Sequence, residues 1–151
     1  MDNIERAVAC FKEGFNCSQS VIATYGPEFG LDRRSAADVA LAFGGGIAHT
    51  GQTCGAATGA LMVIGLAVAR KDLPLPEAKK KAYALGGEFL AKFRARGGST
   101  DCLTLIGCRL DTPEAMKQAL EKGLFRTVCP KLIRTAAEIL EELLKTEGTS
   151  A

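Results

Sequence analysis

Residues 44–70 read GGGIAHTGQTCGAATGALMVIGLAVAR, and this stretch decides the fold. A glycine-rich segment ends at Cys54, and the residues from Cys54 to Ala69 form the most apolar run of the chain. That run is shorter than the roughly 20 apolar residues that a membrane-spanning helix needs. The stretch therefore predicts a buried central helix with a cysteine at its start. Its first turns carry small side chains, at Gly55, Ala56, Gly59 and Ala60, which allow another backbone or a bulky group to approach closely.

Helical periodicity extends along nearly the whole chain, and no segment alternates as a half-buried strand does. Start and stop residues predict further helices at Asp2–Gly14, Cys17–Tyr25, Asp32–Phe43, Pro76–Phe93 with Gly97 and Gly98 behind it, a short turn after Asp101, Thr112–Gly123, and a last helix from about Pro130 that frays over residues 145–151. The expected fold class is all-α, a compact helical bundle that forms one domain over residues 1–151.

Apolar spacing also predicts which side of each helix is buried. In the third helix the inward positions are Ala36, Val39, Ala40 and Phe43. In the last helix they are Leu132, Ile133, Ala136, Leu140 and Leu143.

Composition excludes several classes of partner. The formal net charge is +2, which is too small to indicate binding to nucleic acid or to anionic membranes. The first residues, MDNIERAVACFKEG, lack the basic and apolar regions of an export signal. We therefore expect a cytoplasmic protein with no nucleic-acid or membrane partner.

Six cysteines are many for such a chain: Cys10, Cys17, Cys54, Cys102, Cys108 and Cys129. In a reducing compartment, stable disulfides are disfavoured and grouped thiols more often indicate a metal or redox chemistry.

Four of these cysteines stand at the expected start of a helix. Asn16, Thr53 and Asp101 each precede a cysteine, and all three are residue types that cap helix N-termini. Cys129 precedes Pro130, which favours the first helical turn. The sequence thus predicts Cys17, Cys54, Cys102 and Cys129 in the first turns of four helices, where unpaired N–H groups stabilise a thiolate and lower its pKa.

Such thiolates suit an iron–sulfur cluster or a tetrahedral zinc ion if the helix starts converge. Their wide separation along the chain differs from the short pairs of zinc knuckles and common ferredoxins, so the residues alone leave redox thiols and scattered core cysteines open as well. Cys10 is expected to be a buried apolar residue, and Cys108 a spare thiol. His49 is expected to be exposed or hydrogen-bonded. Its alternative roles are a donor to a cluster sulfur or a base that ionises Cys54.

Four segments together resemble a known family: FNCSQSVI, FGGGIAHTGQTCGAATGALMVIGL, DCLTLIGCRLDTPE and GLFRTVCPKLIRTAAEIL. They are similar to the CGAxxG-type (C_GCAxxG_C_C) family of redox-active bacterial proteins, over about Phe11 to Leu140. The motif itself falls on residues 54–59, CGAATG. The resemblance places the family cysteines on Cys17, Cys54, Cys102 and Cys129, and similar domains attached to haem regions of cytochromes imply a [2Fe-2S] cluster held by four cysteines.

Three functions are therefore weighed. The first is an iron–sulfur protein for electron transfer or redox sensing, with the four family cysteines as cofactor and metal ligands, no catalytic residue and a redox protein or oxidoreductase as partner. The second is a thiol–disulfide oxidoreductase with Cys54 as nucleophile and His49 as its base. The third is a structural zinc site on the same four cysteines. The oligomeric state stays open, and a homodimer is one option.

Overall fold

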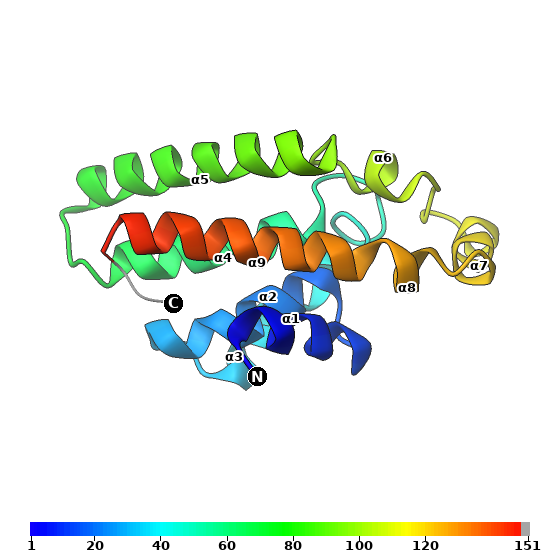
Figure 1. Cartoon of the computed structure of the whole chain (residues 1–151), viewed down its shortest axis with the longest axis horizontal. Coiled ribbons are helices and arrows are strands. Elements are labelled where there is room, and N and C mark those ends of the chain that lie inside the picture. The colour runs from blue at the N-terminus through cyan, green and yellow to red at the C-terminus, as the bar shows by residue number, and fades with distance from the viewer. Residues whose placement is uncertain (149–151) are drawn as a thin grey trace.

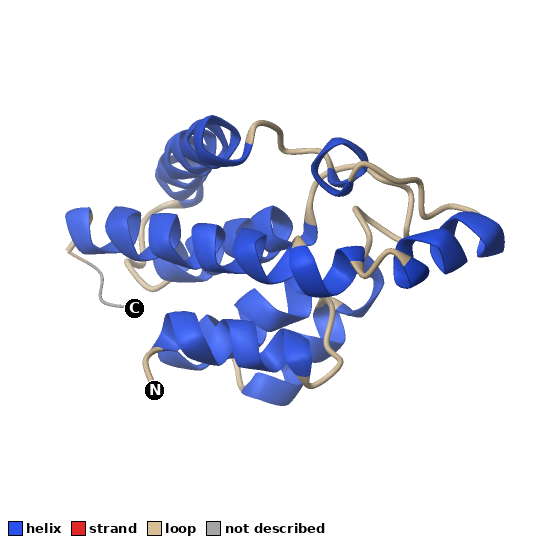
Figure 2. Cartoon of the chain, turned by 45° about the vertical axis from the view of Figure 1, so that its right-hand side comes forward, coloured by secondary structure: helices blue, strands red, loops and turns tan. Residues whose placement is uncertain are grey.

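Helix α4 (Gly55–Ala69) is the central element of the structure, a computed structural model that describes residues 1–148. It contacts α2 (Cys17–Tyr25), α5 (Leu75–Gly97) and α9 (Cys129–Thr146). Helix α1 (Asn3–Lys12) packs on α2 and α9 (Figure 1). The predicted all-α class is confirmed, since residues 1–148 form helices and loops and contain no strand (Figure 2).

The remaining elements are short. They are the 3-10 turns η1 (Gly26–Phe29) and η2 (Leu41–Phe43) and the helices α3 (Arg33–Val39), α6 (Cys102–Ile106), α7 (Pro113–Glu121) and α8 (Leu124–Thr127). Helices α6 to α8 lie together at one end of the long α4, α5 and α9 helices (Figure 1). The predicted fraying of the chain end falls partly on residues 149–151, which lie outside the described residues.

Side chains fix several of the predicted helix starts. The Asp2 carboxylate accepts a hydrogen bond from the N–H of Glu5 at 2.9 Å. Asn16 and Gln19 form a reciprocal capping box, in which each side-chain oxygen accepts from the backbone N–H of the other residue. The Thr112 hydroxyl accepts from the N–H of Ala115 at 3.1 Å. These caps satisfy donors that would otherwise be left unpaired at the first turns.

Helices α2 and α4 approach each other unusually closely. A Cβ added to Gly59 would lie 2.7 Å from the carbonyl oxygen of Ser18, and one added to Gly55 would lie 3.0 Å from the Cβ of Cys17. The side-chain hydroxyl of Thr58 also lies 3.2 Å from that of Ser18. The small residues predicted to allow a close approach are therefore used for helix packing, and the packing brings the starts of α2 and α4 together.

Two groups of buried apolar residues form the interior. The larger group joins α1, α2, α4, α5 and α9. The smaller group lies beneath α6 and α7 and consists of Cys102, Ile106, Leu110, Ala119 and Cys129. The inward face predicted for the last helix is confirmed, because Leu132, Ile133, Ala136, Leu140 and Leu143 are all buried.

Three predictions about the elements are wrong. The third helix ends at Val39, with 3-10 turn η2 after it, and the Val39 side chain is 58% exposed instead of inward. The buried face of α3 passes through Ala36 and Ala37 and continues to Ala40, which turns Val39 toward solvent. Helix α8 was not expected, since Gly123 with φ of +66° ends one helix and directly starts the next. Thr53 does not cap α4, because Cys54 itself is the cap residue.

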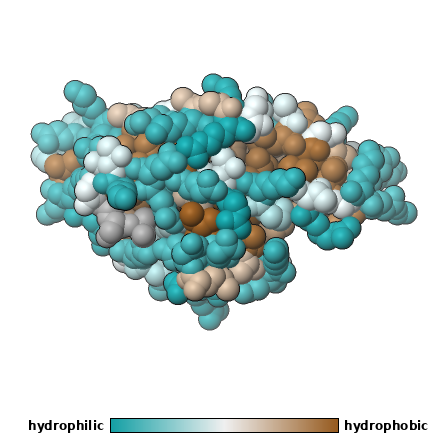
Figure 3. Space-filling view, viewed as in Figure 1, coloured by the Kyte–Doolittle hydropathy of each residue, from teal (hydrophilic) through white to brown (hydrophobic). Residues whose placement is uncertain are grey.

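No helix within residues 1–148 is both long and apolar enough to cross a membrane. The surface shown in Figure 3 carries both hydrophilic and hydrophobic residues. The hydrophobic ones gather in the region of α6 and the start of α9.

The contact between α2 and α4 predicts opposite effects for one substitution at two glycines of the same helix. Gly59→Ala should lower the free energy of unfolding by about 1–3 kcal/mol, because the new methyl meets the Ser18 backbone. Gly65→Ala should raise it by up to about 1 kcal/mol, because Gly65 is exposed, nothing lies within 4 Å of its added Cβ, and alanine favours the helix. Urea unfolding followed by circular dichroism measures both. Equal effects at the two positions would contradict the close contact.

Candidate functional site: a cavity lined by four cysteines

Four helix starts carry the cysteines of interest. Cys17, Cys102 and Cys129 are the first residues of α2, α6 and α9. Cys54 is the cap residue of α4, with the extended backbone that such residues adopt. The prediction of four cysteines at helix N-termini is confirmed, with the correction that Cys54 stands one position earlier than expected.

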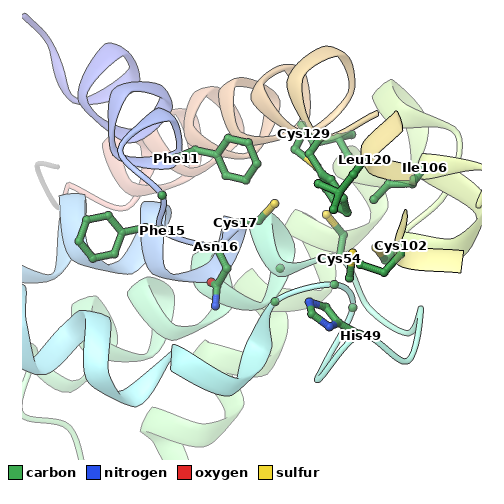
Figure 4. A pocket seen from close by; sticks show the side chains of 18 residues that line it. Phe11, Phe15, Asn16, Cys17, His49, Cys54, Cys102, Ile106, Leu120 and Cys129 are labelled. Atoms are coloured by element: carbon green, nitrogen blue, oxygen red, sulfur yellow. The ribbon is translucent and has the colours of Figure 1, made fainter. Parts of the chain in front are cut away.

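These four side chains line one cavity of about 520 Å³, called the cysteine cavity below. Figure 4 shows them converging on it from separate segments of the chain. The cavity lies between the larger and the smaller buried group, and the Cys17 side chain contacts both. The fold thus gathers thiols that are far apart in the sequence.

A short backbone bridge joins the segments that carry Cys54 and Cys102. The N–H of Cys54 donates to the carbonyl of Thr100 at 2.8 Å, and the N–H of Cys102 donates to the carbonyl of Gln52 at 2.7 Å. Since the bonded N–H groups belong to the cysteines themselves, the bridge fixes their backbones relative to each other.

A left-handed turn forms the edge of the cavity beside this bridge. The five residues from Gly45 to His49 all have positive φ, and three of them, Ile47, Ala48 and His49, are not glycine. A left-handed helical conformation costs a residue with a Cβ about 1–2 kcal/mol. Gly46 lies under Cys102, where an added Cβ would be 2.6 Å from the Cys102 Cβ. Backbone strain of this kind is often found at functional sites. Here the strained residues belong to the turn that packs against Cys102.

His49 is exposed, as expected, and lines the cysteine cavity. Its ring lies against Gly45, where an added Cβ would meet the imidazole. Within residues 1–148 it makes no side-chain hydrogen bond to a cysteine, so its alternative role as a base for Cys54 gains no support.

The expectation of lowered thiol pKa values is wrong for three of the four cysteines. Burial raises the pKa of Cys54 to about 11, although the N–H groups of Ala56 and Ala57 act in the opposite direction. Burial also raises the pKa of Cys102 to about 12, with smaller contributions from Cys54 and Cys129. The helix N-terminus acts as predicted at Cys54, but the loss of water outweighs it.

Cys17 and Cys129 behave as a pair. Their mutual hydrogen bond raises the pKa of Cys17, together with its burial, and lowers the pKa of Cys129. Once one proton has left, the remaining S–H can donate to the thiolate, so the first ionisation of the pair is eased and the second is opposed.

No group of three or more His, Cys, Asp or Glu side chains within residues 1–148 is placed to hold a single metal ion. Cys17 and Cys129 interact directly, and the backbone bridge holds the main chains of Cys54 and Cys102 together. All four thiols are near enough for the charges of Cys54, Cys102 and Cys129 to act on Cys17. The lining supplies four thiols and the His49 imidazole, and no Asp, Glu, Lys or Arg lines the cavity.

The other two cysteines do not line the cysteine cavity. Cys10 is buried among the apolar residues of α1, as expected, and a guanidinium nitrogen of Arg33 lies 3.7 Å from its sulfur. Cys108 is half-buried on the connection between α6 and α7. Apolar residues line the rest of the cavity and were not predicted as site residues; they include Phe11, Phe15, Met116, Leu120 and Phe125. Their spacing alone resembles that of ordinary core positions.

The strain in the left-handed turn makes Ala48→Gly a stabilising change. Glycine adopts positive φ without steric cost, so the free energy of unfolding should rise by about 1 kcal/mol despite the more flexible unfolded chain. The matched control is Ala91→Gly at an exposed site within α5, which should lower stability by about 1 kcal/mol. Thermal unfolding of both variants measures the difference. A loss of stability at both sites would show that the turn is unstrained.

The thiol pKa values predict an order of alkylation in the reduced, metal-free protein. Cys54, Cys102 and Cys129 are all almost fully buried, so their thiolate fractions decide the order. At pH 8, iodoacetamide should modify Cys129 first, then Cys54 and last Cys102. The rates at Cys54 and Cys102 should climb about tenfold per pH unit until the pH nears 11 and 12 respectively. Peptide mass spectrometry measures each site, and a plateau below pH 10 at either one would contradict the assignment.

Comparison with known protein families matches residues 15–143 to the family described as "Putative redox-active protein (C_GCAxxG_C_C)". Neither curated proteins nor solved structures gave a significant match. The matched range covers most of the chain and includes all four cysteines of the cavity. The chain therefore belongs to the C_GCAxxG_C_C family of redox-active, cysteine-containing proteins.

Proposed function

We propose that this protein holds an iron–sulfur cluster of the [2Fe-2S] type in the cysteine cavity and uses it for electron transfer or redox sensing. The observation that carries the proposal is the convergence of four cysteines, from four separate helix starts, on one cavity. The proposed ligands are Cys17, Cys54, Cys102 and Cys129. Such a cluster, when bound, supplies one-electron transfer at a potential set by its surroundings.

The grouping of the thiols favours a two-iron cluster over a single ion. A tetrahedral zinc site needs four donors around one ion, at about 2.3 Å for each sulfur. No three donors within residues 1–148 are placed in that way. A [2Fe-2S] cluster divides its four thiolates between two irons, two on each. We propose that Cys17 and Cys129 hold one iron, because they interact directly, and that Cys54 and Cys102 hold the other, because the bridge keeps their main chains together. A structural zinc site is accordingly the less supported candidate.

The surroundings also suit a cluster whose thiolate-ligated form is an anion. The thiols sit at helix N-termini, whose N–H groups favour negative charge. The absence of Asp and Glu from the cavity lining avoids repulsion. Burial disfavours free thiolates, but a bound metal offsets their negative charge. Cluster binding therefore releases the thiol protons, and it should be easier at higher pH.

Thiol–disulfide exchange at Cys54 is the alternative and has weaker support. An attacking thiol needs access and a substantial thiolate fraction. Cys54 is buried, its pKa is raised to about 11, and within the described residues His49 makes no hydrogen bond to it. The proposed partner is consequently a redox protein or oxidoreductase that exchanges electrons, and we propose that the exchange takes place in the cytoplasm.

The test is anaerobic expression and purification followed by iron and acid-labile sulfide analysis, with visible and EPR spectra. The expected content is about two irons and two sulfides per chain. Alanine replacement of any of the four cavity cysteines should lower bound iron by at least about tenfold, since even outer contacts of metal sites change affinity by 10–100-fold.

Cys10→Ala and Cys108→Ala are the matched controls, because these cysteines lie outside the cavity lining. Both should keep the iron and the spectrum. Helix content from circular dichroism separates lost metal from lost fold. A colourless protein without iron and sulfide, even after anaerobic reconstitution, would refute the proposal. So would equal iron content in the cavity and control variants.

A further inference from the structure

The cysteine cavity is larger than the proposed cluster needs. Its volume is about 520 Å³. A [2Fe-2S] core has only four inorganic atoms, so it would occupy part of this cavity. The cavity as a whole is within the range of small-molecule pockets, roughly 300–1,000 Å³. It therefore has room for a second occupant.

We infer that the cysteine cavity also binds a neutral, flat molecule of one or two rings that carries a ring carbonyl, which is the chemistry of a quinone. The molecule would lie in the part of the cavity away from the four thiols, and the inference does not require a cluster to be present. Three features of the cavity wall support it: the side chains that face a ring, the lack of charge, and one available hydrogen-bond donor.

The walls away from the thiols are apolar and rich in aromatic side chains. Phe11 lies on the Cys17 side of the cavity, while Cys54 and Cys102 lie on its other side (Figure 4). Phe15 also lines the cavity, but its ring is already in a cation–π contact with the Arg33 guanidinium, 5.3 Å from the ring centre. Phe125 adds a third ring to the lining. Aromatic rings favour stacked or edge-to-face contact with another ring. Such contacts contribute more binding free energy than the burial of apolar surface alone.

The charge of the lining restricts the ligand. No Lys, Arg, Asp or Glu lines the cavity, so a phosphate or carboxylate would find no counter-charge and would pay for its desolvation. Nucleotides and organic acids are therefore poor fits. A neutral ring with one weak hydrogen-bond acceptor loses little hydration free energy when it enters this cavity.

One hydrogen-bond donor at the edge of the cavity is free to bond to a ligand carbonyl. The Asn16 amide is already used, because its nitrogen donates to the carbonyls of Ala40 and Leu41 and its oxygen accepts from the N–H of Gln19. The His49 imidazole has no hydrogen-bond partner within residues 1–148, and it is held against Gly45 by the left-handed turn. A ring N–H of His49 is thus the one side chain besides the thiols that can donate to a ligand in the cavity.

The test uses 2,3-dimethyl-1,4-naphthoquinone, whose methylated positions block addition of cysteine thiols, with 2,3-dimethylnaphthalene as the ligand without carbonyls. Calorimetric titration is done under nitrogen on the reduced full-length chain, both with and without iron. We expect saturable binding of the quinone with one site per chain. Binding by the iron-free protein would support this inference even if the cluster proposal failed.

Two tryptophan variants locate the site. Leu120 is 60% exposed and lines the cavity, and Tyr83 is 71% exposed on α5 and lies outside it. Leu120→Trp should fill the cavity and weaken quinone binding by roughly tenfold or more. Tyr83→Trp should leave binding unchanged. Because the natural chain has no tryptophan, fluorescence of each variant reports directly on its own position. Equal affinities of the two variants would overturn the inference.

His49→Gly tests the carbonyl contact and keeps the positive φ of the turn. Quinone affinity should fall about fivefold, the worth of one hydrogen bond, while affinity for 2,3-dimethylnaphthalene stays the same. If the hydrocarbon binds the unaltered protein as tightly as the quinone, the assignment of a carbonyl ligand is wrong. Absence of saturable binding by either compound overturns the inference as a whole.

Discussion

The close contact between the N-terminal turns of α2 and α4 is the constraint on which the site depends. Only glycine at positions 55 and 59 allows the α4 backbone to reach Ser18 and Cys17. This contact sets Cys17 beside the start of α4, where Cys54 is the cap residue. Helix α9 then packs on both helices and brings Cys129 to the same place. The glycines of the CGAATG motif therefore position the cysteines through helix packing.

Local sequence signals predicted the helices well, because caps and apolar spacing act over a few residues. Asp2, Asn16 and Thr112 cap the helices that they were expected to cap. The end of α3 was missed because a switch to a 3-10 turn depends on packing against α2 instead of on residue type. The chain belongs to the family that its four segments indicated.

The sequence was enough to predict which cysteines line the cavity. It was not enough to predict the direction in which their pKa values shift. The positions of Cys17, Cys102 and Cys129 follow from neighbouring residues, so the sequence placed them correctly at helix starts. Their pKa values depend on burial, which is set by contacts between distant segments. For Cys54 and Cys102 that burial outweighs the helix N-terminus and reverses the predicted shift. The left-handed turn at Gly45–His49 and the size of the cavity are likewise products of tertiary packing.

The central claim is that two pairs of cysteine sulfurs hold two irons in one cavity. Iron K-edge X-ray absorption of the anaerobically purified protein tests it most directly, because the fine structure reports both the atoms bound to iron and its nearest metal neighbour. The account predicts sulfur as the only ligand type and one iron atom as a close neighbour of each iron. Oxygen or nitrogen ligands, or an iron without a metal neighbour, would contradict it.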